Sequence, residues 1–202
     1  MAAAGLQHGP LGKNCLHVCV DMQRLFAAGG PWPIRWLERI LPTIEEAVSK
    51  HPSQTLFTRF VPADRPGEGV GSWARYYRRW ADVTLAKIDA SLVDLVPPLA
   101  RFVPPARVLD KRVYSPWTEG GLDRFLRGAE FDTLIVTGGE TDVCVLATVL
   151  GAIDRGFRVI VVTDAVCGSA DETHDALMAL YHSRFSEQVE VAAMQEVLDA
   201  WD

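Results

Sequence analysis

Three side chains of different chemistry stand at or just after short apolar runs of the chain. Asp21 lies near the end of HVCVDM at 17–22, Lys111 ends ARVLDK at 106–111, and Cys144 follows TLIVTG at 133–138. A thiolate is a nucleophile, a carboxylate can take up the thiol proton, and a nearby ammonium group favours the charged form of an acid. Together they could attack a carbonyl carbon and transfer the proton that this step requires.

The segment around Cys144 predicts a helix that begins close to the thiol. In GGETDVCVLATVLGAIDRG, Thr141 or Asp142 is the expected N-cap and Gly156 the expected C-terminal stop. At a helix start, unpaired N–H groups and the positive end of the dipole favour a thiolate. The position predicts a lowered pKa for Cys144, and the same N–H groups could hold an oxyanion.

Each of these residues also has an ordinary structural interpretation. A cysteine in an apolar helix is usually an inert core residue, an aspartate after a strand often caps the next helix, and a lysine is often a surface residue. The chemical interpretation is favoured because all three side chains are expected at the same edge of one sheet.

Alternating strands and helices would position these residues. Strand-length runs also occur at 55–61, 157–165 and 188–193, and helical spacing at 34–50, 72–80, 121–127, 143–155 and 172–184. Such alternation predicts a parallel sheet with helices on both faces. The stretches 29–33, 62–71 and 97–105 are expected loops, and 81–105 is expected to hold a short helix and a long covering loop.

The strand order decides whether the three residues meet. Ligands bind open α/β sheets beyond the carboxyl ends of the strands, where the strand order reverses. With six strands in the order 3-2-1-4-5-6, the first and fourth strands flank that point. Asp21 and Cys144 would then lie opposite each other.

Composition limits the class of protein. The chain has 202 residues, of which 49% are hydrophobic, and we expect one domain over residues 1–202. Its net charge is −6 and no segment concentrates Lys and Arg, so nucleic acid is not expected as a partner. Without a signal-like N-terminus or a membrane-length apolar segment, we expect a cytoplasmic protein away from membranes. Cys15 and Cys19 are expected to be buried, free thiols.

The chain resembles the isochorismatase-like cysteine hydrolases, a family that includes nicotinamidases and N-carbamoylsarcosine amidases. The resemblance rests on VCVDMQRLF at 18–26, KRVYSPW at 111–117 and TGGETDVCVLATVLGAIDRGFRVIVVTDA at 137–165. It implies a three-layer α/β/α Rossmann-like fold with a six-stranded, mostly parallel sheet. It also implies a catalytic triad of Asp21, Lys111 and Cys144, a cis peptide between Gly139 and Glu140, and an oxyanion hole from the backbone N–H groups of Glu140 and Cys144.

The implied activity is that of an amidohydrolase. The thiol attacks a small amide or carbamoyl substrate, a thioester forms, and ammonia or an amine leaves. No cofactor is implied, and relatives generally form homodimers or homotetramers. The motifs place five candidates for substrate contacts near strand ends, namely Phe26, Arg59, Phe60, Tyr114 and Trp117. Arg59 could bind a substrate carboxylate or form an ordinary ion pair.

The sequence departs from nicotinamidases in two places. Their metal site follows the second strand, but FTRFVPADRPGEG at 57–69 has Asp64 and no histidine, so no metal site is expected. Glu140 stands where nicotinamidases commonly have a small residue, and its carboxylate could orient a substrate amine or cap a helix.

Other interpretations stay open. The helix at 72–80 could cover the pocket or simply pack with a charged outer face. A vinyl ether hydrolase that uses Asp21 alone and a catalytically silent binding protein are the alternative functions, although a silent protein has no chemical need for all three residues.

Overall fold

A six-stranded parallel sheet forms the centre of the protein. The computed structural model describes residues 5–201. Residues 1–4, part of the stretch in which no signal was expected, and Asp202 lie outside the described part. The strands are β1 (Cys15–Val20), β2 (Thr55–Phe60), β3 (Arg107–Lys111), β4 (Thr133–Gly139), β5 (Arg158–Cys167) and β6 (Val189–Ala192). Their order is β3-β2-β1-β4-β5-β6 and every pairing is parallel, which confirms the predicted topology.

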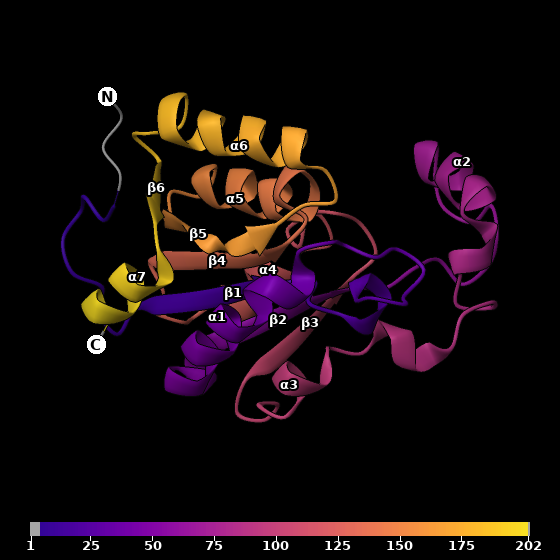
Figure 1. Cartoon of the computed structure of the whole chain (residues 1–202), viewed down its shortest axis with the longest axis horizontal. Coiled ribbons are helices and arrows are strands. Elements are labelled where there is room, and N and C mark those ends of the chain that lie inside the picture. Colours follow the sequence, from indigo (N-terminus) through magenta and orange to yellow (C-terminus); the bar gives the residue numbers. More distant parts are fainter. Residues whose placement is uncertain (1–4, 202) are drawn as a thin grey trace.

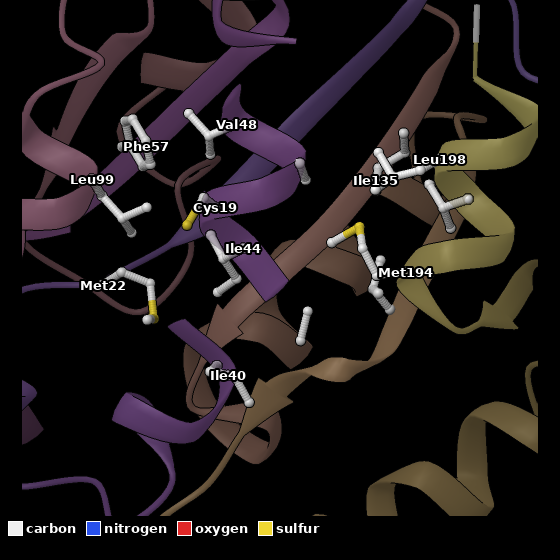
Figure 2. Close-up of a cluster of buried hydrophobic side chains, with 14 of the residues drawn as sticks. Cys19, Met22, Ile40, Ile44, Val48, Phe57, Leu99, Ile135, Met194 and Leu198 are labelled. Atoms are coloured by element: carbon white, nitrogen blue, oxygen red, sulfur yellow. The ribbon is translucent and has the colours of Figure 1, made fainter. Parts of the chain in front are cut away.

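Helices cover both faces of this sheet (Figure 1). One face carries α1 (Leu37–Lys50) and α7 (Met194–Ala200); the other carries α4 (Gly121–Leu126), α5 (Leu146–Ile153) and α6 (Asp171–Ser183). Strand β1 shows why both faces need cover. Cys15 and Cys19 pack with α1, as Figure 2 shows for Cys19, whereas Leu16 and Val18 pack on the opposite face. Both cysteines are buried and free, as predicted.

The positions of two helices were not predicted from the sequence. α3 (Pro97–Ala100) lies in the stretch 97–105 that was expected to be a loop, and α7 follows β6 directly. Proline is well suited to the first helical positions because their N–H groups have no helical partner, and α3 begins with two prolines. In α7, Met194, Val197 and Leu198 are buried at helical spacing, and the packing of Met194 and Leu198 is visible in Figure 2.

The segment after β2 extends to one side of the three layers. It contains α2 (Ser72–Arg79), which stands apart from the sheet in Figure 1. Residues 81–105 follow with 3₁₀ turns at Ala81–Val83 and Ala90–Val93 and then α3. This agrees with the expected short helix and covering segment. Within residues 5–201, no helix has both the length and the apolar composition to span a membrane.

Candidate active site

Asp21 lies immediately after β1 in an unusual backbone conformation. Its φ is +52°, and it is the one non-glycine residue among those described with a positive φ. Its backbone N–H donates to the Thr58 carbonyl at 3.2 Å, and the Thr58 hydroxyl donates to Asp21 Oδ1 at 2.6 Å. The neighbouring strand β2 therefore fixes both the backbone and the carboxylate of Asp21.

Lys111 joins Asp21 to Cys144. Its Nζ lies 2.7 Å from Asp21 Oδ2, 3.4 Å from Cys144 Sγ and 3.3 Å from the Val113 carbonyl oxygen. Lys111 is the last residue of β3, so its side chain reaches past β2 to meet Asp21. The exposed fractions are 2% for Asp21, 2% for Lys111 and 7% for Cys144. The structure thus brings together the three residues that the sequence places after separate strands.

The sequence predicted that Cys144 lies in the first turn of a regular α-helix, and this prediction is wrong. Residues Thr141–Val145 form a π-helical turn, and α5 begins only at Leu146. The N-cap is Glu140, not Thr141 or Asp142, and no side chain caps it. The carbonyl of Glu140 accepts bonds from the N–H groups of Val143 and Val145. Single π turns in helices are frequent at functional sites.

The lowered pKa predicted for Cys144 is wrong. Burial raises the pKa of the Cys144 thiol well above its ordinary value, the carboxylate of Asp21 raises it further, and Lys111 only partly opposes them. Burial by itself lowers the pKa of Lys111, but the charges of Asp21 and Cys144 outweigh it and the pKa is raised. Burial and the charge of Asp21 therefore favour the protonated form of the thiol, and the charge of Asp21 favours the charged form of the lysine.

A cavity of about 440 Å³ opens above these residues. Asp21 and Cys144 lie at its base, and six aromatic rings contribute to its walls. The complete lining is Asp21, Phe26, Pro31, Trp32, Pro33, Ile34, Phe60, Tyr76, Trp80, Tyr114, Gly139, Glu140, Val143, Cys144 and Ser169. The cavity is large enough for a small organic molecule and is mostly apolar above its reactive base.

Three of the five predicted substrate contacts line this cavity, namely Phe26, Phe60 and Tyr114. Arg59 does not, because successive side chains of a strand point to opposite faces and Phe60 takes the cavity side. The Arg59 guanidinium forms ion pairs with Asp110, at 2.7 Å from Nε, and with Asp94, at 3.0 Å from Nη1. Of its two interpretations, the structure supports the ordinary ion pair.

Trp117, the other predicted contact, is a core residue. It is 5% exposed, and its Nε1 donates to the Thr148 carbonyl at 2.9 Å. It packs directly on Gly151 of α5, where a Cβ atom would come within 2.1 Å of Trp117 Cδ1. Trp117 therefore joins the segment after β3 to α5, and the missing side chain at Gly151 makes that contact possible.

Residues that sequence reasoning missed form much of the wall. Trp32 lies at its centre, with its ring 6.2 Å from Phe26, 6.0 Å from Tyr76 and 5.7 Å from Trp80. Tyr76 lies in α2 and Trp80 is its C-cap residue four positions later, so the end of one helix supplies both. The helix predicted at 72–80 both covers the pocket and has a charged outer face. Tyr76 and Trp80 line the cavity, and the arginines of α2 are exposed.

Gln23 is a further residue that the sequence did not single out. It is fully buried, and its Nε2 donates to the carbonyls of Phe60 at 3.0 Å and Val93 at 2.7 Å. Its Oε1 accepts from the Phe60 N–H at 2.7 Å. Gln23 therefore ties the end of β2, and with it the ring of Phe60, to the covering segment 81–105.

Of the two roles that the sequence allowed for Glu140, helix capping is not found, since the N-cap of α6 is Ala170 and no side chain bonds to it. The Gly139–Glu140 peptide bond is cis. Glu140 lines the cavity, and its Oε1 accepts a hydrogen bond from the Ser169 N–H at 3.1 Å, in the loop before α6. The carboxylate thus faces the cavity and also holds the neighbouring loop.

The residues present do not fit the metal site of nicotinamidases. Asp64 is exposed, and its Oδ1 lies 3.3 Å from Nη2 of Arg112. Among residues 5–201, no group of three His, Cys, Asp or Glu side chains is arranged to hold a metal ion.

Named relatives share parts of this sequence. The chain is 38% identical over 95 residues to a nicotinamidase of Escherichia coli, covering 44% of this chain and 42% of the relative. It is 28% identical over 144 residues to an N-carbamoylsarcosine amidase of Arthrobacter sp, covering 68% of this chain and 53% of the relative. The chain thus spans about half or less of the length of these relatives.

Solved structures extend the similarity to nearly the whole chain. A cysteine hydrolase from Pseudomonas syringae superposes with a TM-score of 0.77 at 22% identity, covering 96% of this chain and 98% of that one. An N-carbamoylsarcosine amidase from Thermoplasma acidophilum superposes with a TM-score of 0.71 at 20% identity, covering 90% and 96%. At these identities the likeness shows the fold. The profile of the isochorismatase domain matches residues 15–193, and the chain therefore belongs to the isochorismatase family.

Proposed function

We propose that this protein is a metal-independent cysteine hydrolase of small amide or carbamoyl substrates, with Cys144 as nucleophile and Asp21 as the acid–base group. The observation that carries the proposal is the Lys111 ammonium group, in contact with both the Asp21 carboxylate and the Cys144 sulfur at the base of the cavity. Relatives named nicotinamidase, maleamate amidohydrolase and N-carbamoylsarcosine amidase support this class of substrate.

In the first half of the reaction the Cys144 sulfur is acylated. Because burial and Asp21 raise the pKa of Cys144, the thiolate forms as its proton passes to Asp21. The sulfur attacks the carbonyl carbon, the carbon–nitrogen bond breaks, and the nitrogen takes the proton from Asp21. Ammonia or an amine leaves, and the acyl group stays on Cys144 as a thioester.

Backbone N–H groups would stabilise the negative oxygen of the intermediate. We assign this role to the N–H groups of Glu140 and Cys144, at the turn that carries the nucleophile. The N–H groups of Val143 and Val145 already donate to the Glu140 carbonyl, which favours the N–H groups of Glu140 and Cys144 for this role.

In the second half a water molecule hydrolyses the thioester. Asp21 takes a proton from the water, the resulting hydroxide attacks the thioester carbonyl, and the carbon–sulfur bond breaks. The sulfur regains the proton from Asp21 and the free acid leaves. Lys111, whose pKa is raised, stays positively charged and balances the negative charge as it moves between Asp21 and Cys144.

The proposal is tested by ammonia release from a panel of small amides and ureido acids, with Cys144→Ala beside the wild type. Cys15→Ala is the matched control, since Cys15 is a buried thiol of β1 that does not line the cavity. We expect turnover in the wild type and the control, none in Cys144→Ala, and a wild-type acyl-enzyme adduct by mass spectrometry after rapid quenching.

The same panel separates the alternatives. Amide turnover that survives in Cys144→Ala would contradict the covalent mechanism. Hydrolysis of isochorismate that survives in Cys144→Ala but not in Asp21→Ala would indicate a vinyl ether hydrolase. Absence of turnover with every compound would favour a silent binding protein.

A further inference from the structure

The cavity combines aromatic walls with an excess of negative charge. Phe26, Trp32, Phe60, Tyr76, Trp80 and Tyr114 supply the rings, and the lining includes the carboxylates of Asp21 and Glu140 but no Lys, Arg or His side chain. The charge of Asp21 is balanced by Lys111 at 2.7 Å. Glu140 forms no ion pair with any cationic side chain in the described part of the chain.

The carboxylate of Glu140 is only half engaged. Its Oε1 accepts the hydrogen bond from the Ser169 N–H, while no described residue donates to Oε2. A carboxylate at the wall of an apolar cavity gains most from a positively charged donor, since such hydrogen bonds are about twice as strong as neutral ones.

The aromatic rings around Trp32 favour the same kind of ligand group. The faces of Trp and Tyr rings attract cations, and desolvated contacts of this kind are stronger than exposed ones. The rings lie close to the two functional groups, because Tyr76, Tyr114, Glu140 and Cys144 all line the same cavity. Rings, carboxylate and thiol therefore act on one small space.

We propose that this pocket selects small amides that carry a positively charged amine, with the ammonium group bound by the Glu140 carboxylate and the rings of Trp32, Tyr76 and Trp80. This inference rests on the proposed function and specifies its substrate class. Amides that carry a carboxylate are selected against, because they would meet a second negative charge without a cationic partner in the lining.

The first test compares amides that differ only in charge. In the aliphatic series, 4-aminobutanamide, pentanamide and succinamate carry an ammonium, a methyl and a carboxylate group, respectively. In the aromatic series the compounds are 4-(aminomethyl)benzamide, 4-ethylbenzamide and 4-carboxybenzamide. We expect kcat/KM for the cationic amide to exceed that of its neutral partner by about tenfold or more in at least one series, with the anionic amide slowest.

The second test separates the charge of Glu140 from its contact with Ser169. Glu140→Gln keeps an oxygen that can accept from the Ser169 N–H but removes the charge. We expect the ratio of kcat/KM between cationic and neutral amide to fall by about tenfold in this variant. Asp171→Asn is the control, because Asp171 is an exposed carboxylate at the start of α6 outside the cavity lining, and its ratio should equal that of the wild type.

A binding measurement keeps this inference separate from the proposed mechanism. With Cys144→Ala, calorimetry should show tighter binding of the cationic amide than of its neutral partner, and Glu140→Gln in that background should remove the difference. If no amide is hydrolysed but this preference in binding is present, the proposed function fails and the inference stands. Equal binding and equal turnover of the cationic and neutral amides in both series would overturn the inference.

Discussion

The reactive residues and the aromatic wall above them are built in different ways. Asp21 directly follows β1, Lys111 ends β3 and Cys144 lies in the turn after β4, so the sheet sets their positions. The wall takes Trp32 from the loop after β1, Tyr76 from α2 and Trp80 from the C-cap of α2, a helix that stands apart from the three layers (Figure 1). Under the proposed mechanism, the sheet therefore determines which bond is attacked, whereas the covering segments determine which molecule is held there.

Removal of the acid–base group should give the largest effect. We expect Asp21→Asn to lower kcat/KM for a hydrolysed amide by about 10² to 10⁴, because the thiol proton loses its acceptor. Circular dichroism should show the native fold, so that the loss is assigned to chemistry. A decrease of less than about fivefold would mean that another group takes the proton.

Two tryptophans sharpen the comparison through opposite effects. Trp117→Ala should lower the free energy of unfolding by about 3–5 kcal/mol, because it empties a buried site. Trp80→Ala should cost about 1 kcal/mol, since Trp80 is only half-buried, but it should raise KM by about 2- to 30-fold. Urea denaturation and steady-state kinetics measure the two effects, and an exchange of the two phenotypes would place Trp117, not Trp80, at the substrate.

The pH dependence of thiol alkylation tests the environment of Cys144. Because its pKa is raised, the thiolate fraction should increase about tenfold per unit between pH 7 and 9, and the rate with iodoacetamide should follow. Asp21→Asn should shift this profile to lower pH, since Asp21 contributes to the raised pKa. The rate is measured by peptide mass spectrometry with Cys19 as the internal reference. A wild-type rate already constant at pH 7 would instead indicate a lowered pKa.

The smallest effect is expected for Arg59. Arg59→Met should leave KM within about twofold of the wild type and lower the free energy of unfolding by about 0–1 kcal/mol, because the ion pairs to Asp94 and Asp110 are partly exposed. A large increase in KM, confined to amides that carry a carboxylate, would show that Arg59 reaches the substrate after all.

Predictions about the strands succeeded, whereas predictions about which side chains line the cavity succeeded for some residues and failed for others. The alternation of apolar runs and helical spacing was sufficient for the strands and their parallel arrangement, and the common order 3-2-1-4-5-6, taken as the expectation, brought Asp21 and Cys144 together. Arg59 and Trp117 stand beside correctly placed motif residues, yet one points to the other side of β2 and the other fills the space over Gly151. A residue's position in a motif does not fix the direction of its side chain.

The local environment of Cys144 shows the same limit. A helix start predicts a lowered pKa, but the π-helical turn and the burial of the thiol are outcomes of packing against β4, α6 and Lys111. Desolvation then outweighs the effect expected from the helix.

The sequence by itself therefore determined the strands, their parallel arrangement and the three residues at or beyond their carboxyl ends, because hydrophobic periodicity and residue type are local properties of the chain. Only the tertiary structure decided the shape and charge of the pocket. Trp32, Tyr76 and Glu140 are far apart in sequence, and they share a cavity because the loop after β1, α2 and the turn before α5 fold against one another. Contacts of this kind leave no periodic signal in the chain.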